Sequence, residues 1–141
     1  MNKIEPLKWS SMYSVNDEVI DAQHQQLFDI TNRLADIYEK GSGDLLPIFK
    51  DIIDFLSKHF HAEHMLMKKT DYPDLEDHMH QHQDFVDKIE KYLNTYRADD
   101  MEVTYSMLSF LRNWIFNHTT GIDIRYRDHI IKTREKVPVK R

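Results

Sequence analysis

The chain contains no cysteine, which excludes disulfide bonds, thiolate metal sites and iron–sulfur clusters. Glycine and proline are also scarce, with 3 and 4 copies in 141 residues, so few positions interrupt regular structure. No apolar run approaches the length of a membrane span, and residues 1–6 lack the apolar segment of a signal peptide. These absences predict a helical, cytoplasmic protein without membrane insertion.

The charge and histidine content narrow the class of function further. The formal net charge is -5, which argues against a nucleic-acid partner because such proteins present basic surfaces. A chain of 141 residues can bury one full core, so we expect a single domain over residues 1–141. The sequence has 9 histidines, and imidazole is the most common metal-binding side chain. The histidines are therefore the first candidates for metal ligands.

Four stretches repeat apolar residues at intervals of three and four, the pattern of a helix buried on one face. These stretches cover about residues 20–39, 45–69, 75–96 and 102–119. An extended arm, residues 1–19, precedes them, with Trp9 and Tyr13 as expected anchors. A C-terminal segment, 122–141, follows, and its residues 122–136 form either a short extra helix or a continuation of the fourth helix past Gly121. No stretch alternates as a strand would, so the pattern predicts an all-α, up-down-up-down four-helix bundle.

The connections between these stretches carry signals for turns and helix ends. Residues 41–43, Gly-Ser-Gly, end the first helix. The Tyr72-Pro73 pair breaks the second, and Asp74 is a candidate to cap the third. Asp99 and Asp100 mark a turn and the start of the fourth.

Seven polar residues occupy positions in these apolar stripes. They are His24, His59, Glu63, His78, His82, His118 and Asp123. His59 and Glu63 are four apart, as are His78 and His82, and four residues advance about 400° around an α-helix, so each pair shares one face. Buried imidazoles and carboxylates are costly without a common partner. The set therefore predicts a metal site in the core rather than a network of hydrogen bonds alone.

The number of these groups distinguishes one metal from two. A tetrahedral zinc ion takes about four ligands, which would leave three buried polar groups unexplained. Two six-coordinate metals offer twelve positions. If both carboxylates and one solvent oxygen bridge the metals, these groups and five imidazoles fill eleven and leave one open for a small ligand. That bridging is an assumption, and the donor set itself suits iron, manganese or zinc.

His118 and Asp123 are the one pair at an unusual spacing. They are five residues apart, about 500° on an ideal α-helix, so they do not share a face. For both to reach one site, the helix must end or bulge between them. Gly121 lies in this interval and tolerates the required backbone, so we expect a break near it.

The chain resembles the hemerythrin family in its bacterial single-domain form (bacteriohemerythrin). The resemblance runs from Trp9 to Tyr126, and its fragments are Ile20-Asp21-Ala22-Gln23-His24, His59-Phe60-x-x-Glu63, Tyr72-Pro73, His78-x-x-x-His82-x-x-Phe85 and Trp114-Ile115-x-x-His118, with Asp123 and Tyr126. Each fragment alone is weak, whereas all seven candidate ligands in order are specific. Myohemerythrin is itself an example of the up-down-up-down bundle, so the resemblance also implies this fold.

The resemblance implies a non-haem di-iron protein that binds dioxygen reversibly, as a carrier or store rather than an enzyme. Its ligands would divide into three sets: His78, His82 and His118 on one iron, His24 and His59 on the other, and Glu63 and Asp123 bridging both. An oxo or hydroxo group would complete the bridge. The iron with two histidines would have the open position.

Five residues are candidates to line the oxygen pocket: Phe28, Phe60, Trp114, Ile115 and Thr119. At Thr119 the chain departs from the family, which usually has a bulky aliphatic residue there. A hydroxyl could donate a hydrogen bond to bound oxygen or admit water, and water promotes oxidation of the metals. Two alternatives therefore stay open: a di-iron peroxidase, oxidase or nitric-oxide-processing protein, and an oxygen or redox sensor read by an unidentified protein partner. Ferritin-like iron oxidation fits less well, because no Glu-x-x-His motif is present.

Overall fold

The computed structural model describes residues 5–97 and 100–136, with the side chains at 119–124, 135 and 136 outside the description. Its helical elements, in chain order, are η1 (Ser11–Tyr13), α1 (Glu18–Lys40), α2 (Leu46–Lys69), α3 (Leu75–Thr95), α4 (Met101–Trp114), η2 (Ile115–Ile122) and α5 (Asp123–Lys136). No strand occurs in the described ranges. None of the helices described is both long and apolar enough to cross a membrane.

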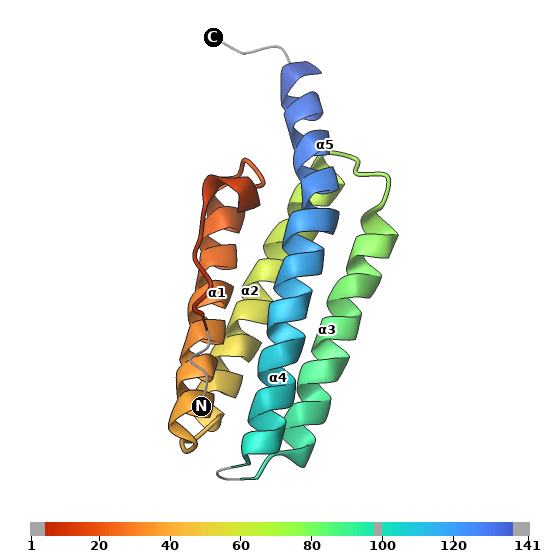
Figure 1. Cartoon of the computed structure of the whole chain (residues 1–141). Coiled ribbons are helices and arrows are strands. Elements are labelled where there is room, and N and C mark those ends of the chain that lie inside the picture. Colours follow the sequence, from red (N-terminus) through yellow and green to blue (C-terminus); the bar gives the residue numbers. More distant parts are fainter. Residues whose placement is uncertain (1–4, 98–99, 137–141) are drawn as a thin grey trace.

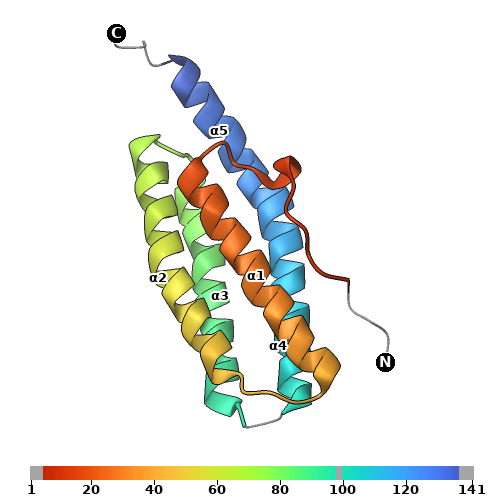
Figure 2. The same ribbon diagram turned by 90° about the vertical axis from the view of Figure 1, so that its left-hand side faces the viewer.

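The four long helices form the predicted up-down-up-down bundle. Helices α1 and α3 run in one direction and α2 and α4 in the other, and each packs against its neighbours in chain order (Figure 1). Helix α4 also packs against α1, which closes the bundle. Helix α5 continues the line of α4 and projects beyond the bundle at the end that carries the α2–α3 connection (Figures 1 and 2).

The predicted helix ends at Gly41 and Asp100 are confirmed, the predicted cap at Asp74 is wrong, and Asp17 is a cap that was not predicted. The Asp17 side chain accepts hydrogen bonds from the backbone N–H groups of Val19 and Ile20, and Asp100 accepts one from the N–H of Val103. Gly41 ends α1 in the left-handed conformation, with φ at 71°. Asp74 precedes α3 as predicted, but its side chain makes no capping hydrogen bond, because its backbone is not in the extended conformation typical of a cap.

The N-terminal arm runs beside α1 on the side where α4 lies (Figure 2), and Arg112 of α4 donates a hydrogen bond to the backbone oxygen of Glu5. Trp9 and Tyr13 both pack edge-on against Phe28, with ring centroids 5.4 and 5.2 Å away. The Asn32 amide pairs with both the backbone N–H and the C=O of Leu7, at 2.8 and 2.9 Å. The arm is therefore held by ring packing and by hydrogen bonds together, as expected for Trp9 and Tyr13.

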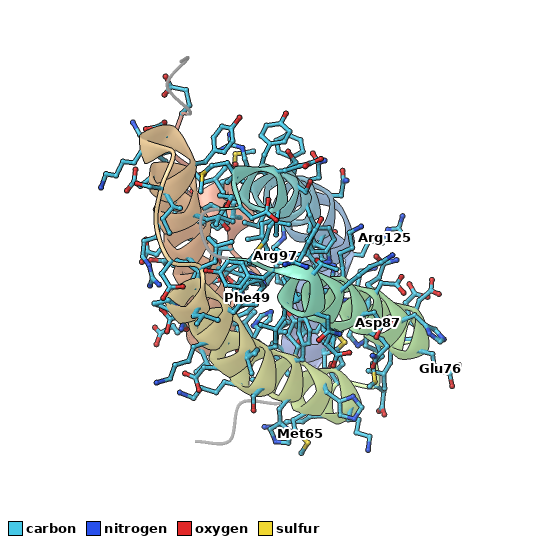
Figure 3. All side chains as sticks on the ribbon, turned by 90° about the horizontal axis from the view of Figure 1, so that it is seen from below. Phe49, Met65, Glu76, Asp87, Arg97 and Arg125 are labelled. Atoms are coloured by element: carbon cyan, nitrogen blue, oxygen red, sulfur yellow. The ribbon has the colours of Figure 1, made fainter. Side chains whose placement is uncertain are left out.

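The core is arranged in layers along the bundle axis. A large apolar cluster that includes Phe49, Phe55 and Phe85 fills most of the bundle, and a smaller one, with Met67 and Tyr126, lies near α5. Viewed down the bundle, Phe49 points between the helices, whereas Met65 and Glu76 project outward (Figure 3). On α2, α3 and the α4–η2 segment, the buried histidines and Glu63 fall between positions belonging to the two clusters, which places one layer of imidazole and carboxylate groups inside a largely apolar core.

Between His118 and Asp123 the helix bulges rather than ends, so the first of the two expected arrangements, a break near Gly121, is wrong and the second is confirmed. The fourth helix neither ends at residue 119 nor breaks at Gly121, because η2 is a π-helix that joins α4 to α5 without interruption. In a π-helix the backbone hydrogen bond runs from residue i to i+5, so positions five apart follow one another along the same side. The unusual spacing is thus met by widening the helix.

Candidate metal centre

The bundle brings six of the seven predicted residues into one buried cluster. They are His24 from α1, His59 and Glu63 from α2, His78 and His82 from α3, and His118 from η2. Each is 6% exposed or less. The backbone of Asp123 begins α5, one π-turn after His118, while its side chain lies outside the description.

Glu63 is at the centre of this cluster, and its two oxygens face different histidines. Oε1 lies 2.8 Å from Nε2 of His59 and 3.3 Å from Nε2 of His24. Oε2 lies 2.8 Å from Nε2 of His78 and 3.1 Å from Nε2 of His82. One carboxylate therefore joins two separate groups of imidazoles.

The same division follows from the positions of the metal-binding atoms. Two sets each have one nitrogen or oxygen per residue, all within 4.8 Å of one another: Glu63 with His78, His82 and His118, and Glu63 with His24 and His59. Glu63 is common to both sets. Imidazole nitrogen and carboxylate oxygen are the donors that iron, manganese and zinc accept in the absence of thiolate, so the residues fit a metal centre.

The electrostatics of the cluster keep the carboxylate ionised. Burial alone would raise the pKa of Glu63, but the charge of His59 and hydrogen bonds from His24, His59 and His78 hold it well below its ordinary value. Burial also lowers the pKa of His82 to about 4, against the opposing attraction of Glu63. An ionised carboxylate and a neutral imidazole are the forms that bind a metal ion, and these shifts favour them at Glu63 and at His82 near neutral pH.

These shifts predict that the metal-free protein loses stability in acid. Unfolded His82 takes up a proton around pH 6.5, whereas folded His82 does so only near pH 4. Between these values protonation stabilises the unfolded state relative to the folded state and so lowers the free energy of unfolding. Stability should be complete above pH 6.5 and fall by about 3 kcal/mol as the pH approaches 4. The lowered pKa of Glu63 adds a loss that begins below its ordinary value of 4.5.

Urea unfolding of the metal-free protein at several pH values between 7 and 4.5 measures this effect. His82→Asn should flatten the profile, while His80→Asn, at an exposed position on the same helix, should leave it unchanged. A free energy of unfolding that is constant across this range in the unmodified protein would contradict the assignment.

Three histidines of the cluster are each stacked face to face on an aromatic ring. The pairs, with their centroid distances, are Phe55 on His59 (4.8 Å), Phe60 on His82 (3.8 Å) and Trp114 on His118 (4.1 Å). Stacking fixes the plane of each imidazole, because rotation of the ring would require the aromatic neighbour to move. The cluster is therefore oriented by apolar contacts as well as by Glu63.

The five candidate pocket residues take different places. Phe60 and Trp114 lie against cluster histidines, whereas Phe28 packs under the arm with Trp9 and Tyr13. Ile115 is buried in the large apolar cluster. The side chain of Thr119 lies outside the description.

Two contacts of His59 are not predicted from the sequence. The side-chain oxygen of Gln23, on α1, lies 2.8 Å from Nδ1 of His59 on α2. Gln23 stands in the fragment Ile20–His24, but it lies about 100° away from His24 around the helix and so outside the apolar stripe. Stacking of Phe55 on His59 was also missed, since Phe55 reads only as a core residue.

The remaining four histidines are not in the cluster. His61 and His80 are exposed, as their positions on the outer faces of α2 and α3 predict. His64 and His129 are half-buried, and Nε2 of His129 contacts the backbone oxygen of Thr70 at the end of α2. That contact attaches α5 to the connection after α2.

The fold and the cluster together define a metal-binding four-helix bundle. A family model described as "Hemerythrin HHE cation binding domain" matches residues 15–126. The chain therefore belongs to the hemerythrin family. This agrees with the resemblance that the ligand spacing suggests.

Individual relatives cover most of the chain. It is 30% identical over 122 residues to a hemerythrin-like protein of Naegleria gruberi, with 86% of this chain and 92% of the relative aligned. It is 25% identical over 128 residues to a bacteriohemerythrin of Stenotrophomonas maltophilia, covering 88% and 81% of the two chains. It is also 27% identical over 123 residues to a myohemerythrin of Theromyzon tessulatum, covering 87% and 92%.

Proposed function

We propose that this protein binds two iron ions in the buried cluster and reversibly binds dioxygen at one of them, as a carrier or store without catalytic turnover. The division of contacts at Glu63 carries this proposal, because Oε1 faces His24 and His59 while Oε2 faces His78 and His82. A carboxylate with this division of contacts would bridge two metals bound in the two sets. Membership of the hemerythrin family supports iron as the metal.

The proposed ligand sets differ in size. One metal would be held by His78, His82 and His118, and the other by His24 and His59, with Glu63 shared. We infer that Asp123 is the second bridge, since the π-helix aligns its backbone position with that of His118. The metal with fewer histidines would then keep a free position, at which bound iron would supply reversible binding of dioxygen.

The chain's own residues would protect this chemistry from water. The cluster lies between two apolar layers, and Phe60 and Trp114 cover two of its histidines. Exclusion of solvent matters because water and protons promote oxidation of the metals at the expense of release of dioxygen.

Oxygenation of the reduced protein tests the proposal directly. The purified protein should contain two irons per chain, and admitting oxygen to the anaerobically reduced form should produce a charge-transfer absorption that disappears on deoxygenation. Metal analysis that finds a single zinc ion per chain would overturn the proposal. Rapid, irreversible oxidation with turnover of peroxide or nitric oxide would favour an enzyme instead.

Thr119 provides a second test of the carrier function. If its hydroxyl admits water to the pocket, Thr119→Leu and Thr119→Ile should slow autoxidation, by about tenfold for a change of 1.4 kcal/mol in the barrier. The rate is followed as loss of the oxygenated absorption at fixed oxygen pressure. An unchanged or faster rate would show that Thr119 does not limit the lifetime of the oxygenated state.

A further inference from the structure

The hydrogen bond between Gln23 and His59 connects the metal cluster to a residue outside the two proposed ligand sets. Nδ1 of His59 lies 2.8 Å from Oε1 of Gln23, and Nε2 of the same ring lies 2.8 Å from Oε1 of Glu63. The ring thus points one nitrogen outward to α1 and the other into the cluster. His59 itself is completely buried.

The chemistry of the ring determines which atom donates in this contact. A metal bound at Nε2 requires the lone pair of that nitrogen, so the single proton of a neutral imidazole must be on Nδ1. Nδ1–H then donates to the amide oxygen of Gln23, which accepts. A glutamine presenting its N–H₂ group at this place would oppose metal binding, because two donors would face one another.

We propose that Gln23 is the positioning residue of His59, and that it sets the affinity and the redox potential of the metal held by His24 and His59. This inference rests on the proposed di-iron function. An outer-shell acceptor fixes the tautomer and the orientation of a ligating histidine and raises its basicity, and its loss costs about 10–100-fold in metal affinity. Here the Gln23 oxygen would act through His59 on the metal that has the free coordination position.

Gln23 adds a polar contact at Nδ1 of His59 to the ring packing around it. Phe55 stacks on the ring with an interplanar angle of 16°, which fixes the ring plane but not which nitrogen carries the proton. The His24 ring lies on another side, with centroids 4.7 Å apart. The Gln23 oxygen at Nδ1 therefore favours the tautomer that carries its proton there.

An amide at this position has a different effect from a carboxylate. The neutral Gln23 oxygen accepts a hydrogen bond without adding charge, whereas a glutamate would make a charge-assisted hydrogen bond and increase the basicity of His59. A more basic ligand stabilises the oxidised metal. Glutamine thus favours a reduced metal, the form that takes up dioxygen.

Two substitutions at Gln23 and matched changes at Gln25 test the inference. Gln23→Leu removes the acceptor at similar volume and excludes water from its place, while Gln23→Glu replaces it with a charged acceptor. Gln25→Leu and Gln25→Glu make the same changes at an exposed position on the same helix. The readouts are anaerobic cobalt(II) titration, the midpoint potential of the iron-loaded protein, and thermal unfolding of the metal-free protein.

We expect Gln23→Leu to weaken the second cobalt ion by about 10–100-fold while the first binds as in the unmodified protein. Gln23→Glu should bind the second cobalt ion about as tightly as the unmodified protein does, and its midpoint potential should be lower than that of the unmodified protein. The Gln25 variants should change neither quantity. Equal cobalt affinities together with an unshifted potential in both Gln23 variants would overturn the inference, even if Gln23→Leu also lowers the unfolding temperature. Failure of the unmodified protein to bind two ions would instead overturn the di-iron function, and this inference with it.

Discussion

Glu63→Ala is expected to remove both metal ions and to give a protein without an oxygenated spectrum. The carboxylate is the one described side chain common to both ligand sets, so its loss takes a donor from each metal at once. The metal-free protein should also be destabilised by about 3–5 kcal/mol, the usual cost of removing one partner from a buried ionic contact. Metal analysis and urea unfolding measure the two effects separately.

Glu63→Gln is the matched variant for this experiment. It keeps the size of the side chain and one oxygen acceptor but removes the charge, so it should lose the metals with a smaller loss of stability. Exposed Glu76→Ala, on α3, should alter neither property. Retention of two irons and the oxygen spectrum by Glu63→Ala would refute the bridging role.

His59→Ala is expected to abolish oxygen binding while leaving one metal ion in place. His59 belongs only to the smaller ligand set, with His24 and Glu63, whereas the larger set keeps all its described members. The variant should therefore bind about one ion per chain and show no absorption change on oxygenation. His24→Ala should have the same effect, because either change leaves this metal with a single histidine.

His61→Ala is the control for this variant, since His61 is two residues away on α2 but exposed. It should bind two ions and oxygenate normally. Equal loss of both ions from His59→Ala would mean that the two metals are bound cooperatively. Reversible oxygenation by that variant would place the oxygen site on the other metal and contradict the assignment.

The fold could be predicted from the sequence because four helices each bury one face. Apolar residues recur at helical intervals along the chain, and the turn signals at Gly41 and Asp100 act where they were expected. The buried cluster could be predicted for the same reason, as residues such as His59 and Glu63 stand in apolar stripes. Facing stripes in a bundle must meet, whichever residues they contain.

The details that were not predicted depend on distances between helices. Gln23 and His59 are 36 positions apart in sequence, and their contact requires a particular separation of α1 and α2. A polar residue beside a stripe has no periodic signal that distinguishes it from the solvated face. The region of Gly121 shows a second limit, since the spacing of His118 and Asp123 excludes a regular α-helix but does not choose between a break and a π-helix.

The π-helix also determines which face of α5 is turned toward the bundle. Tyr126 and Ile130 on α5 are fully buried against Met67 and Tyr72, and they reach this place only because η2 determines the direction in which α5 faces. Deleting one residue from η2 would allow regular α-helical hydrogen bonds and would turn α5 by about 100° relative to α4. Length in this segment is therefore constrained as strictly as composition, because one residue fewer would turn the apolar face of α5 away from the bundle.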